Sequence, residues 1–451
     1  MALPPEIPLH ESLPNSWRAM RDPIGIFSQY NRAYGHNFLL RLGGVTRALI
    51  STDPEVVQHV LQRNHRNYHK SAIQSEQLAY YLGKGLLTND GDDWLRQRRL
   101  IQPGFHRERI AGLCALMHEV AQGTFQALAQ KGDTTIDVYP VMMDTAFGIM
   151  AYTLFSEGIA QGERQRLGDI ITELQDFIVK PIRLPFLRPW YRISGQIGKH
   201  EKMAKEAFST LARLIAIRRN SGRLRNDLLQ MLLDTRYEDT GEPMADRQLL
   251  EEVIVLLVAG HETSANALAW TLHLLATHPE VQHRLYEEII RILPAADDAP
   301  TPDNLRQAVY LTQVIEESLR LYPPAWITDR VALADDGAAG ISWPKGTLMT
   351  PYIYGLHHHP DFWEQPERFD PDRMHPDRKK ERPAGAYIPF GAGPRLCIGY
   401  SFAMMEMQVV LAMMARQFVL TPAPGAAPRA KALITLRPDP GVTLKLSVRS
   451  Q

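Results

Sequence analysis

Residues 390–399 read Phe-Gly-Ala-Gly-Pro-Arg-Leu-Cys-Ile-Gly and place one of only two cysteines of the 451-residue chain in a glycine-rich loop. A cysteine stays deprotonated when cations and backbone N–H groups surround its sulfur, and glycines let the main chain come that close. Arg395 supplies a cation two residues before Cys397. Tyr400–Met407 contain no proline or glycine and predict a helix, whose N-terminal dipole also favours an anion. We therefore predict that Cys397 is a thiolate ligand of a soft metal or of haem iron.

This loop resembles the haem-binding loop of the cytochrome P-450 superfamily, whose pattern is Phe-x-x-Gly-x-Arg-x-Cys-x-Gly. The matching positions are Phe390, Gly393, Arg395, Cys397 and Gly399. The alternative is a buried structural cysteine in an ordinary loop, which is the usual fate of a lone cysteine. The resemblance implies that Cys397 binds the iron of haem b (iron protoporphyrin IX), and that Phe390, Arg395 and Gly399 contribute to haem binding.

A second motif is Glu317-Ser318-Leu319-Arg320, in a stretch from about Asn304 to Tyr322 whose apolar spacing predicts one helix. Residues three apart share a helix face, so Glu317 and Arg320 can pair. Most such pairs are solvated and contribute less than about 1 kcal/mol. The motif is similar to the Glu-x-x-Arg of the same family, which joins a downstream arginine in a buried network beneath the haem loop. Pro366–Phe369 resembles that downstream motif, which implies that Arg368 is the third member.

A third motif, Ala259-Gly260-His261-Glu262-Thr263, lies inside a helix predicted over residues 246–278. Such a helix is roughly 50 Å long at about 1.5 Å per residue and would cross the protein. The mid-helix glycine and a threonine able to bond back to a carbonyl predict a locally loosened helix with room for a ligand or water. The alternative is a pair of polar residues at the end of an apolar stripe. In the family this acid–alcohol pair lies over the haem and supplies protons during oxygen activation, which implies catalytic roles for Glu262 and Thr263 and a haem contact at Ala259.

Trp94-Leu95-Arg96-Gln97-Arg98 resembles the family's Trp-x-x-x-Arg helix, whose two ends bind a haem propionate. Trp94 and Arg98 lie four residues apart on one predicted helix face, and both are hydrogen-bond donors suited to a carboxylate. Arg395 and Arg330 match positions that add further cations to the propionates. For Arg330 the alternative is an ordinary surface arginine.

Helical patterns dominate the chain up to Tyr322, and short strands are predicted near residues 326–333, 347–352, 434–437 and 443–448. A hairpin is predicted over residues 37–51 with its turn at Gly43-Gly44, and the proline-rich residues 183–191 predict a lid loop between two helices. The fold class is therefore mainly α with a small β-rich region. The resemblance implies the cytochrome P-450 fold, with haem between the long central helix and the cysteine loop helix.

Composition and segment patterns limit the organisation and the location. The chain is 45% hydrophobic and 22% charged with a formal net charge of zero, which gives no reason to expect nucleic-acid binding. No linker or low-complexity break appears, so one domain over residues 1–451 is expected, as a monomer. Two cysteines with different roles offer no disulfide framework. The N-terminus lacks a signal-peptide pattern and no segment approaches the roughly 20 apolar residues of a membrane span, so we expect a cytoplasmic, bacterial-type protein without a transmembrane anchor.

The resemblance implies a monooxygenase that inserts one atom of O2 into a lipophilic small molecule, by hydroxylation or epoxidation, with electrons from NAD(P)H. The chain has too few cysteines for an iron–sulfur cluster, and Gly391-Ala392-Gly393 lacks the third glycine of a dinucleotide loop. Electrons must then come from a separate ferredoxin- or flavodoxin-type protein.

Basic residues in two segments are predicted to dock that redox partner. They are Arg96, Arg99, Arg107 and Arg109 in the first segment and Arg378, Lys379, Lys380 and Arg382 in the second. The alternative is a merely soluble surface. Two other activities compete with monooxygenation: a peroxide-dependent peroxygenase, although such relatives typically lose the acid–alcohol pair, and a non-catalytic haem-thiolate sensor.

Overall fold

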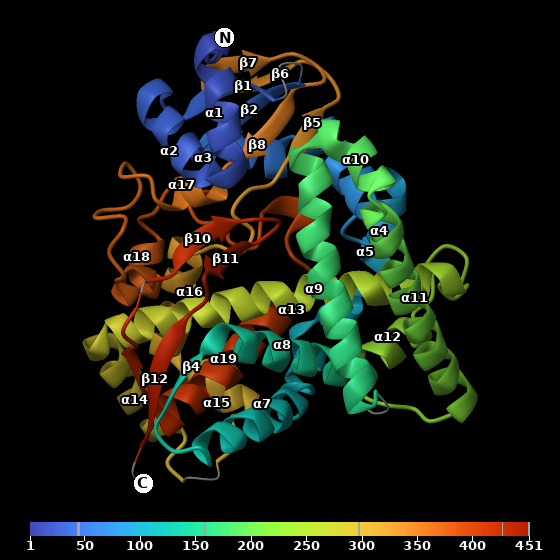
Figure 1. Cartoon of the computed structure of the whole chain (residues 1–451), viewed down its shortest axis with the longest axis vertical. Coiled ribbons are helices and arrows are strands. Elements are labelled where there is room, and N and C mark those ends of the chain that lie inside the picture. Colours follow the sequence, from blue (N-terminus) through green and yellow to red (C-terminus); the bar gives the residue numbers. More distant parts are fainter. Residues whose placement is uncertain (43–45, 157–158, 296–297, 426, 450–451) are drawn as a thin grey trace. The chain divides into compact units, whose positions relative to one another are not determined.

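The computed structural model describes residues 1–42, 46–156, 159–295, 298–425 and 427–449 (Figure 1). It is 61% helical with small sheets, which confirms the predicted fold class. The chain forms two compact units, each assembled from separate stretches of sequence. The first unit contains Met1–Ser71, Gln313–Tyr400 and Arg429–Asp439, and the second contains Ala72–Thr312, Ser401–Pro428 and Pro440–Gln451. The single domain over residues 1–451, the monomeric state and the cytoplasmic location stay predictions.

A five-stranded sheet forms the centre of the first unit, in the order β1-β2-β8-β5-β3. The strands are β1 (Asn37–Leu42), β2 (Thr46–Ser51), β3 (Tyr68–His69), β5 (Arg330–Ala332) and β8 (Leu348–Pro351). The predicted hairpin is present as the antiparallel pair β1–β2, with Leu39 opposite Leu49. Its expected turn at Gly43-Gly44 lies outside the described residues. Strand β2 pairs with β8 in parallel, so segments about 300 residues apart in sequence meet side by side.

The remaining elements of the first unit are short. Two-stranded sheets are formed by β6 (Asp336–Ala338) with β7 (Ile341–Trp343) and by β10 (Arg429–Ala432) with β11 (Leu436–Asp439). The helices and helical turns are α1 (Leu9–Arg21), α2 (Pro23–Tyr34), α3 (Pro54–Gln58), η1 (His59–Arg63), η2 (His65–Asn67), α17 (Ile353–His357), η6 (Pro371–Met374), α18 (Pro376–Lys379) and η7 (Gly393–Arg395).

One carboxylate fastens β6 to the segment that leads into β3. Asp336 accepts hydrogen bonds from the Tyr68 hydroxyl at 2.6 Å and from the Asn64 amide at 2.8 Å, and its oxygen lies 2.9 Å from His59 Nε2. Burial acts to raise the pKa of Asp336, but the hydrogen bonds from Tyr68, His59 and neighbouring donors outweigh it and hold this pKa well below its usual range. The carboxylate therefore stabilises the unit in its ionised form.

The second unit is a helical array with one three-stranded sheet. Its sheet has the order β4-β12-β9, formed by β4 (Thr134–Asp137), β9 (Phe418–Pro422) and β12 (Thr443–Val448). Its helices and turns are η3 (Ile73–Leu78), α4 (Ala79–Leu82), α5 (Gly91–Ile101), η4 (Gln102–Phe105), α6 (Arg107–Ala111), α7 (Cys114–Ala129), α8 (Val138–Phe155), α9 (Gln161–Arg183), η5 (Pro185–Leu187), α10 (Arg188–Ile193), α11 (Gln196–Ser221), α12 (Leu228–Asp234), α13 (Asp246–Thr277), α14 (Pro279–Ile292) and α15 (Pro302–Gln307). Helices α16 (Val309–Leu321) and α19 (Tyr400–Gln417) each span a boundary between the two sets of residues.

The long helix predicted over residues 246–278 is α13, which runs through the core of the second unit and packs along α8 (Figure 1). Its apolar run Val253–Val258 is buried on all sides. Contrary to the expectation of a loosened segment, α13 continues unbroken through Gly260. A Cβ at Gly260 would lie 2.6 Å from the sulfur of Met150 on α8, so the glycine serves close helix packing rather than ligand space.

Two local predictions were wrong. The single helix expected from about Asn304 to Tyr322 is two helices, α15 and α16. They separate because the buried carboxylate of Glu288 on α14 accepts the backbone N–H groups of Tyr310 and Leu311, at 2.9 and 2.8 Å, and so caps a new helix start. Residues 183–191 are also not an open loop: α9 continues to Arg183 through Pro181, and η5 and α10 follow directly.

Two helices are long and apolar enough to cross a membrane by length and composition, namely α8 and α13, contrary to the expectation from sequence that no segment approaches that length. Of the apolar windows in these helices, 67% and 83% of the residues are buried inside the protein, which is typical of core helices.

Candidate functional site

The cysteine loop of the first unit is held by its own backbone. The Cys397 N–H donates to the carbonyl of Phe390 at 3.0 Å, and the Leu396 N–H donates to that of Gly393 at 3.0 Å. The Phe390 ring meets the ring of Tyr400 edge to face, with centroids 4.8 Å apart. Helix α19 begins at Tyr400, as predicted, so the thiol lies three residues before a helix N-terminus.

Glycine is required at one position of this loop. Gly393 has a φ of +69°, and a Cβ there would lie 2.0 Å from the carbonyl oxygen of Leu61 in η1. Any side chain would therefore push the loop away from η1, since backbone atoms cannot yield as a flexible side chain can. The glycine therefore sets how closely the cysteine loop packs against η1.

Cys397 is accessible, unlike the other cysteine of the chain. Cys397 is exposed, and Leu396 and Tyr400, one and three residues away in the sequence, are 40% and 42% exposed. Arg395 is close in sequence and only partly buried. The other cysteine, Cys114, is the contrast: burial raises its pKa to about 11, and its Sγ donates to the Pro300 carbonyl at 3.2 Å. Only Cys397 has the exposure that a thiolate ligand needs.

A buried ion pair, Glu317 with Arg320, lies in the same unit. Both side chains are 0% exposed, and Arg320 donates two parallel hydrogen bonds of 2.8 Å to the two carboxylate oxygens. Arg320 Nη1 also donates to the carbonyls of His357 and Pro366, at 2.8 and 2.7 Å. Burial acts to raise the pKa of Glu317, while Arg320 and the Asp370 N–H act in the opposite direction. The pair is thus a structural anchor, unlike the solvated pair that most Glu-x-x-Arg sequences form.

The predicted third member of this network was wrong. The side chain of Arg368 is on the surface and reaches Gln365 at 3.4 Å, and only its carbonyl contacts Arg320, at 3.2 Å. The guanidinium that lies against Glu317 belongs to Arg373, with Nε 3.4 Å from Oε1 and a side chain 8% exposed. Pro371-Asp372-Arg373 repeats the Pro-acid-Arg pattern of Pro366-Glu367-Arg368 five residues later, and only burial distinguishes them.

His357, which sequence reasoning did not identify, connects this network to the cysteine loop. Its carbonyl accepts from Arg320, and its Nε2 accepts the backbone N–H of Ile388 at 3.0 Å. Its ring stacks on Tyr387, whose hydroxyl donates to the Glu316 carbonyl at 2.8 Å. Burial lowers the pKa of His357 well below its usual value, so the ring is neutral and can accept that bond. The start of the loop is therefore tied to the Glu317–Arg320 pair through one histidine.

In the second unit, the motif lies in the middle of α13, between residues 251–258 and 264–272, which are all buried. Ala259 is exposed and Thr263, one turn later, is partly exposed, while Glu262 is 0% exposed. The Thr263 hydroxyl donates to the Ala259 carbonyl at 2.8 Å, as the sequence predicted. An exposed alanine one turn before a partly exposed threonine, at the middle of a core helix, leaves this side of α13 accessible.

The predicted propionate-binding residues lie on regular elements. Trp94 is buried in α5, and Arg98 is partly buried one turn later, where its Nε donates to Gln102 Oε1 at 3.2 Å. Arg330 is 8% exposed in β5 of the other unit, where its Nη1 donates to the Asp329 carbonyl at 2.5 Å. The alternative of a surface arginine at position 330 is therefore wrong, and the haem-binding role of these residues stays a prediction.

Comparison with known proteins supplies the family. A family model described as Cytochrome P450 matches residues 2–445, nearly the whole chain and both compact units. This chain belongs to the cytochrome P450 family. It is an oxidoreductase of the monooxygenase type, and the family implies a haem-thiolate cofactor.

Two Streptomyces relatives and one solved structure illustrate what this P450 is similar to. It is 36% identical over 394 residues to cyclooctat-9-en-7-ol 5-monooxygenase of Streptomyces melanosporofaciens, covering 87% of this chain and 84% of the relative. It is 32% identical over 436 residues to pentalenene oxygenase of Streptomyces avermitilis, covering 97% and 95%. The crystal structure of the cytochrome P450DA heme domain superposes with a TM-score of 0.88 at 24% identity, covering 100% of this chain and 98% of the other, which shows the shared fold.

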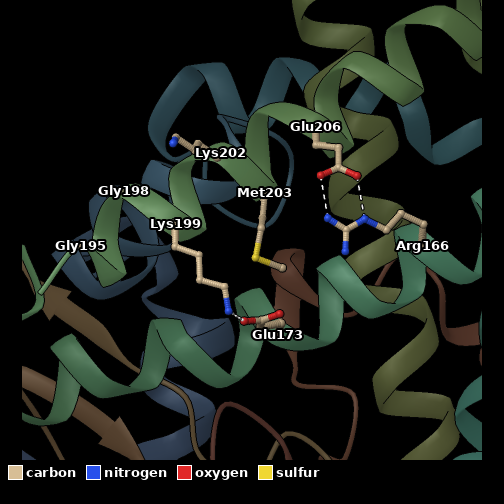
Figure 2. Close-up of a pocket in the computed structure, with 8 residues that line it drawn as sticks. All are labelled: Arg166, Glu173, Gly195, Gly198, Lys199, Lys202, Met203 and Glu206. Carbon is tan, nitrogen blue, oxygen red and sulfur yellow. Dashed lines mark hydrogen bonds and ion pairs between the residues drawn. The ribbon is translucent and has the colours of Figure 1, made fainter.

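A separate groove of the P450 lies between α9 and α11 (Figure 2). It has a volume of about 730 Å³. Arg166 and Glu206 form a two-bond ion pair of 2.7 and 2.8 Å across it, and Lys199 pairs with Glu173. Figure 2 shows these charged groups facing one another across the groove, with the Met203 side chain among them. A groove bridged by ion pairs is a poor site for a lipophilic substrate.

The predicted docking cations of the P450 are partly used within the chain. The Arg382 guanidinium lies over the Trp363 ring, 4.4 Å from its centroid, and Lys379 pairs with Glu316 at 2.5 Å. Arg96 lies over the Tyr237 ring and pairs with Asp239 at 3.2 Å. Lys380 also pairs with Asp377, at 3.2 Å, but its side chain is 78% exposed. That the cations of these two segments dock a redox partner stays a prediction.

Proposed function

We propose that this P450 inserts one oxygen atom of O2 into an apolar carbocyclic molecule of the terpenoid class. The observation that carries the proposal is the exposed Ala259 with the partly exposed Thr263 one turn later, in the middle of the core helix α13. The terpene oxygenases among the relatives, at 32–36% identity, support the substrate class. A small apolar residue beside one hydroxyl suits a hydrocarbon substrate, because no buried charge has to be matched.

Haem b, bound through Cys397, would supply the oxygen-activating chemistry, and a thiolate ligand favours O–O cleavage by donating electron density. Trp94, Arg98, Arg330 and Arg395 would hold its propionates, since all four are N–H donors and three carry a permanent charge. Phe390, Gly399 and Ala259 would contact its faces. The Glu317–Arg320–Arg373 network and His357 would hold the cysteine loop in position for the cofactor.

The acid–alcohol pair handles protons. Because the Thr263 hydroxyl donates to the Ala259 carbonyl, its oxygen keeps its lone pairs for a hydrogen bond from water or from a ligand on the open face. Glu262 is fully buried one residue earlier, so a proton that it passes on must move through neighbouring groups rather than directly from solvent. We infer that Thr263 positions a proton donor and that Glu262 replenishes it.

Electrons would come from NAD(P)H through a separate acidic ferredoxin- or flavodoxin-type protein. We propose that Arg378 and Lys380, 49% and 78% exposed, contribute to its docking. Lys380→Glu should slow reduction by the partner severalfold and weaken the salt dependence of the rate, whereas Lys345→Glu, at an exposed lysine between β7 and β8, should not. Equal rates for the two variants would contradict the proposed docking surface.

The activity is tested with the purified haem protein, a surrogate ferredoxin with its reductase, NADPH and a panel of cyclic terpenes. The expected result is substrate-dependent NADPH consumption with a product that carries one atom from ¹⁸O₂. Turnover supported by hydrogen peroxide alone would replace the proposal with a peroxygenase. NADPH consumption that no apolar substrate stimulates, in a protein with a normal haem spectrum, would favour a non-catalytic haem-thiolate sensor.

A further inference from the structure

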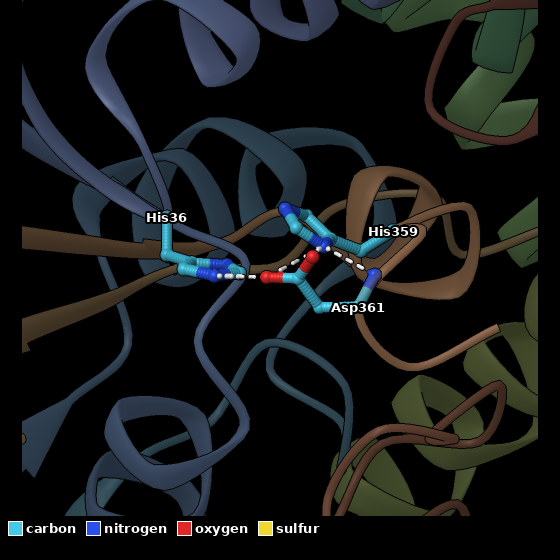
Figure 3. A group of neighbouring side chains, drawn as sticks. All are labelled: His36, His359 and Asp361. Atoms are coloured by element: carbon cyan, nitrogen blue, oxygen red, sulfur yellow. Dashed lines mark hydrogen bonds and ion pairs between the residues drawn. The ribbon is translucent and has the colours of Figure 1, made fainter.

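Two histidines and an aspartate meet in the first unit, away from the cysteine loop (Figure 3). His36 lies between α2 and β1, and His359 and Asp361 follow α17. Each residue offers one ligand atom, and these atoms all lie within 4.8 Å of one another. His36 Nε2 is 3.2 Å from Asp361 Oδ2, and His359 Nδ1 is 3.8 Å from the same oxygen. Figure 3 shows both imidazoles turned toward the carboxylate from opposite sides.

These spacings suit a small metal ion. A tetrahedral zinc ion with bonds of about 2.0 Å places its ligand atoms about 3.3 Å apart. The His36–Asp361 pair is already at that separation. His359 Nδ1 accepts the backbone N–H of Asp361 at 3.3 Å, and a bound ion would have to replace this hydrogen bond. Two imidazoles and one carboxylate are the ligand types that zinc and its neighbours in the transition series prefer, whereas calcium and magnesium prefer oxygen alone.

The residues around the cluster hold His36 in place. The His36 carbonyl accepts the Thr52 N–H at 2.9 Å. Thr52 Oγ1 lies 3.5 Å from His36 Nδ1 and accepts from the Asn31 amide at 2.9 Å. A metal-bound histidine needs an acceptor for the N–H of its other ring nitrogen, and Thr52 Oγ1 is placed to provide it.

The two histidines pack against the ring of Phe362, and the aspartate faces solvent. The two imidazole rings lie 4.1 Å apart, and the Phe362 ring packs 5.5 Å from His36 and 5.2 Å from His359. The side chains of His36 and His359 are 31% and 14% exposed, while that of Asp361 is 61% exposed. An ion can therefore enter from solvent on the aspartate side and keep water at its remaining coordination positions.

We propose that His36, His359 and Asp361 form a binding site for one divalent transition-metal ion, of which Zn²⁺ is the best match. The ion joins the segment before β1 to the segment after α17, which leads into the residues that hold Arg320. Its role is therefore to stabilise the first unit by cross-linking, and it takes no part in oxygen chemistry. The site is independent of the proposed substrate.

The test is a zinc titration of the untagged, haem-loaded, chelator-treated protein, followed by calorimetry and by competition with a chromophoric chelator. We expect one tight site per chain and a rise in the thermal midpoint with added Zn²⁺. His36→Ala, His359→Ala and Asp361→Asn should each raise the zinc Kd at least tenfold. His283→Ala is the matched control, because His283 is an exposed histidine paired with Glu287 at 3.3 Å, and it should leave the tight site unchanged.

Zinc-edge X-ray absorption of the 1:1 complex gives a second readout that the haem iron does not disturb, and it should show two imidazole ligands. Asp361→Asn keeps the proposal testable if a histidine variant fails to fold, since Asp361 is mostly exposed. Zinc binding that is equally tight in the wild type and in Asp361→Asn would overturn the proposal. So would zinc binding no stronger than that of an exposed pair such as His283–Glu287, and either result would leave a simple His–Asp hydrogen bond.

Discussion

At the scale of single residues, Thr263 is the side chain whose position says most about activity. Among the described residues of α13 from Leu256 to Leu274, Ala259 is the only exposed one, and Thr263 lies one turn after it. Its hydroxyl is fixed by the bond to the Ala259 carbonyl, so the oxygen has a defined direction. A fixed acceptor on an open face is what proton positioning requires.

Thr263→Ala should lower product formation per NADPH at least tenfold and raise the share of electrons lost as hydrogen peroxide, because protons are no longer positioned at the open face. The measurement is product, peroxide and NADPH in one assay. Thr271→Ala is the matched control, since Thr271 makes the same bond to a carbonyl four residues earlier, at 2.7 Å, in the buried part of α13. Equal coupling in both variants would contradict the assignment of Thr263.

Asp336→Asn should lower the free energy of unfolding by about 3 kcal/mol at pH 7, because several hydrogen bonds to an ionised carboxylate are weakened. The pKa of Asp336 is depressed in the folded state, so its stabilisation is present above the unfolded value near 4 and is lost as the pH falls through the folded pKa. Urea unfolding at pH 7, 4 and 3 should show a nearly full difference between variant and wild type at pH 7 and pH 4 and a smaller one at pH 3. A difference that is the same at all three pH values, or as large for the exposed control Asp377→Asn, would count against this role.

At the scale of elements, the cysteine loop depends on contacts that lie far from it in sequence. His357, after β8, accepts the backbone N–H of Ile388 at the start of the loop, and Gly393 within the loop packs closely against η1. The buried Glu317–Arg320 pair on α16 supports the segment that contains His357. The same holds for α13 and α19, which are joined by a hydrogen bond of 2.6 Å from the Ser264 hydroxyl to Glu406. These contacts between elements that are distant in the sequence, rather than helix propensity, position the functional segments.

Arg373→Ala should lower the free energy of unfolding by about 4 kcal/mol and reduce haem retention, because it leaves the buried Glu317 with one guanidinium fewer. Arg368→Ala should change stability by less than about 0.5 kcal/mol, since its side chain is on the surface. Chemical unfolding and the ratio of Soret to protein absorbance measure both effects. If Arg368→Ala proved the more damaging variant, the structural reassignment of the network would be wrong.

Glu406 makes the joint between α13 and α19 sensitive to pH. Burial raises its pKa to about 8, above the value near 4.3 of the unfolded chain. The folded state therefore holds this proton more tightly, and the group costs stability as the pH rises from about 4.3 to about 8, by up to about 1.4 kcal/mol per pH unit. In Glu406→Gln this contribution to the free energy of unfolding should not change with pH over that range. In urea unfolding, the variant should therefore become more stable relative to the wild type from pH 5 to pH 8. Parallel pH profiles for wild type and variant, as expected for the exposed control Glu287→Gln, would contradict it.

At the scale of the whole molecule, much of the fold class follows from local patterns in the sequence. The apolar run of α13 predicted that helix to within one residue, and the uninterrupted residues after Gly399 predicted the start of α19, which continues to Gln417. Strand β12 begins and ends where alternation predicted. Local rules failed where a distant group decides the outcome, as when Glu288 splits the helix expected before Tyr322, or when Met150 takes the space beside Gly260.

The candidate site shows the same division. The Glu317–Arg320 pair could be predicted from spacing, because residues three apart share a helix face. The ligand role of Cys397 rests on the resemblance of its loop and stays a prediction. Arg373 and His357 could not be predicted from spacing, because their roles depend on burial and on partners many residues away, and a neighbouring Pro-acid-Arg pattern pointed to Arg368 instead. The His36–His359–Asp361 cluster joins residues more than 300 positions apart, so no local pattern could indicate it.

The central claim is that Cys397 binds haem iron as a thiolate, and the most direct measurement is the absorption spectrum of the reduced, carbon-monoxide-bound protein beside Cys397→Ser. We expect a strongly red-shifted Soret band in the wild type and its loss in the variant, since serine cannot supply a thiolate. A Soret band at the position of haem with a neutral ligand, or a folded wild-type protein that takes up no haem, would contradict the claim.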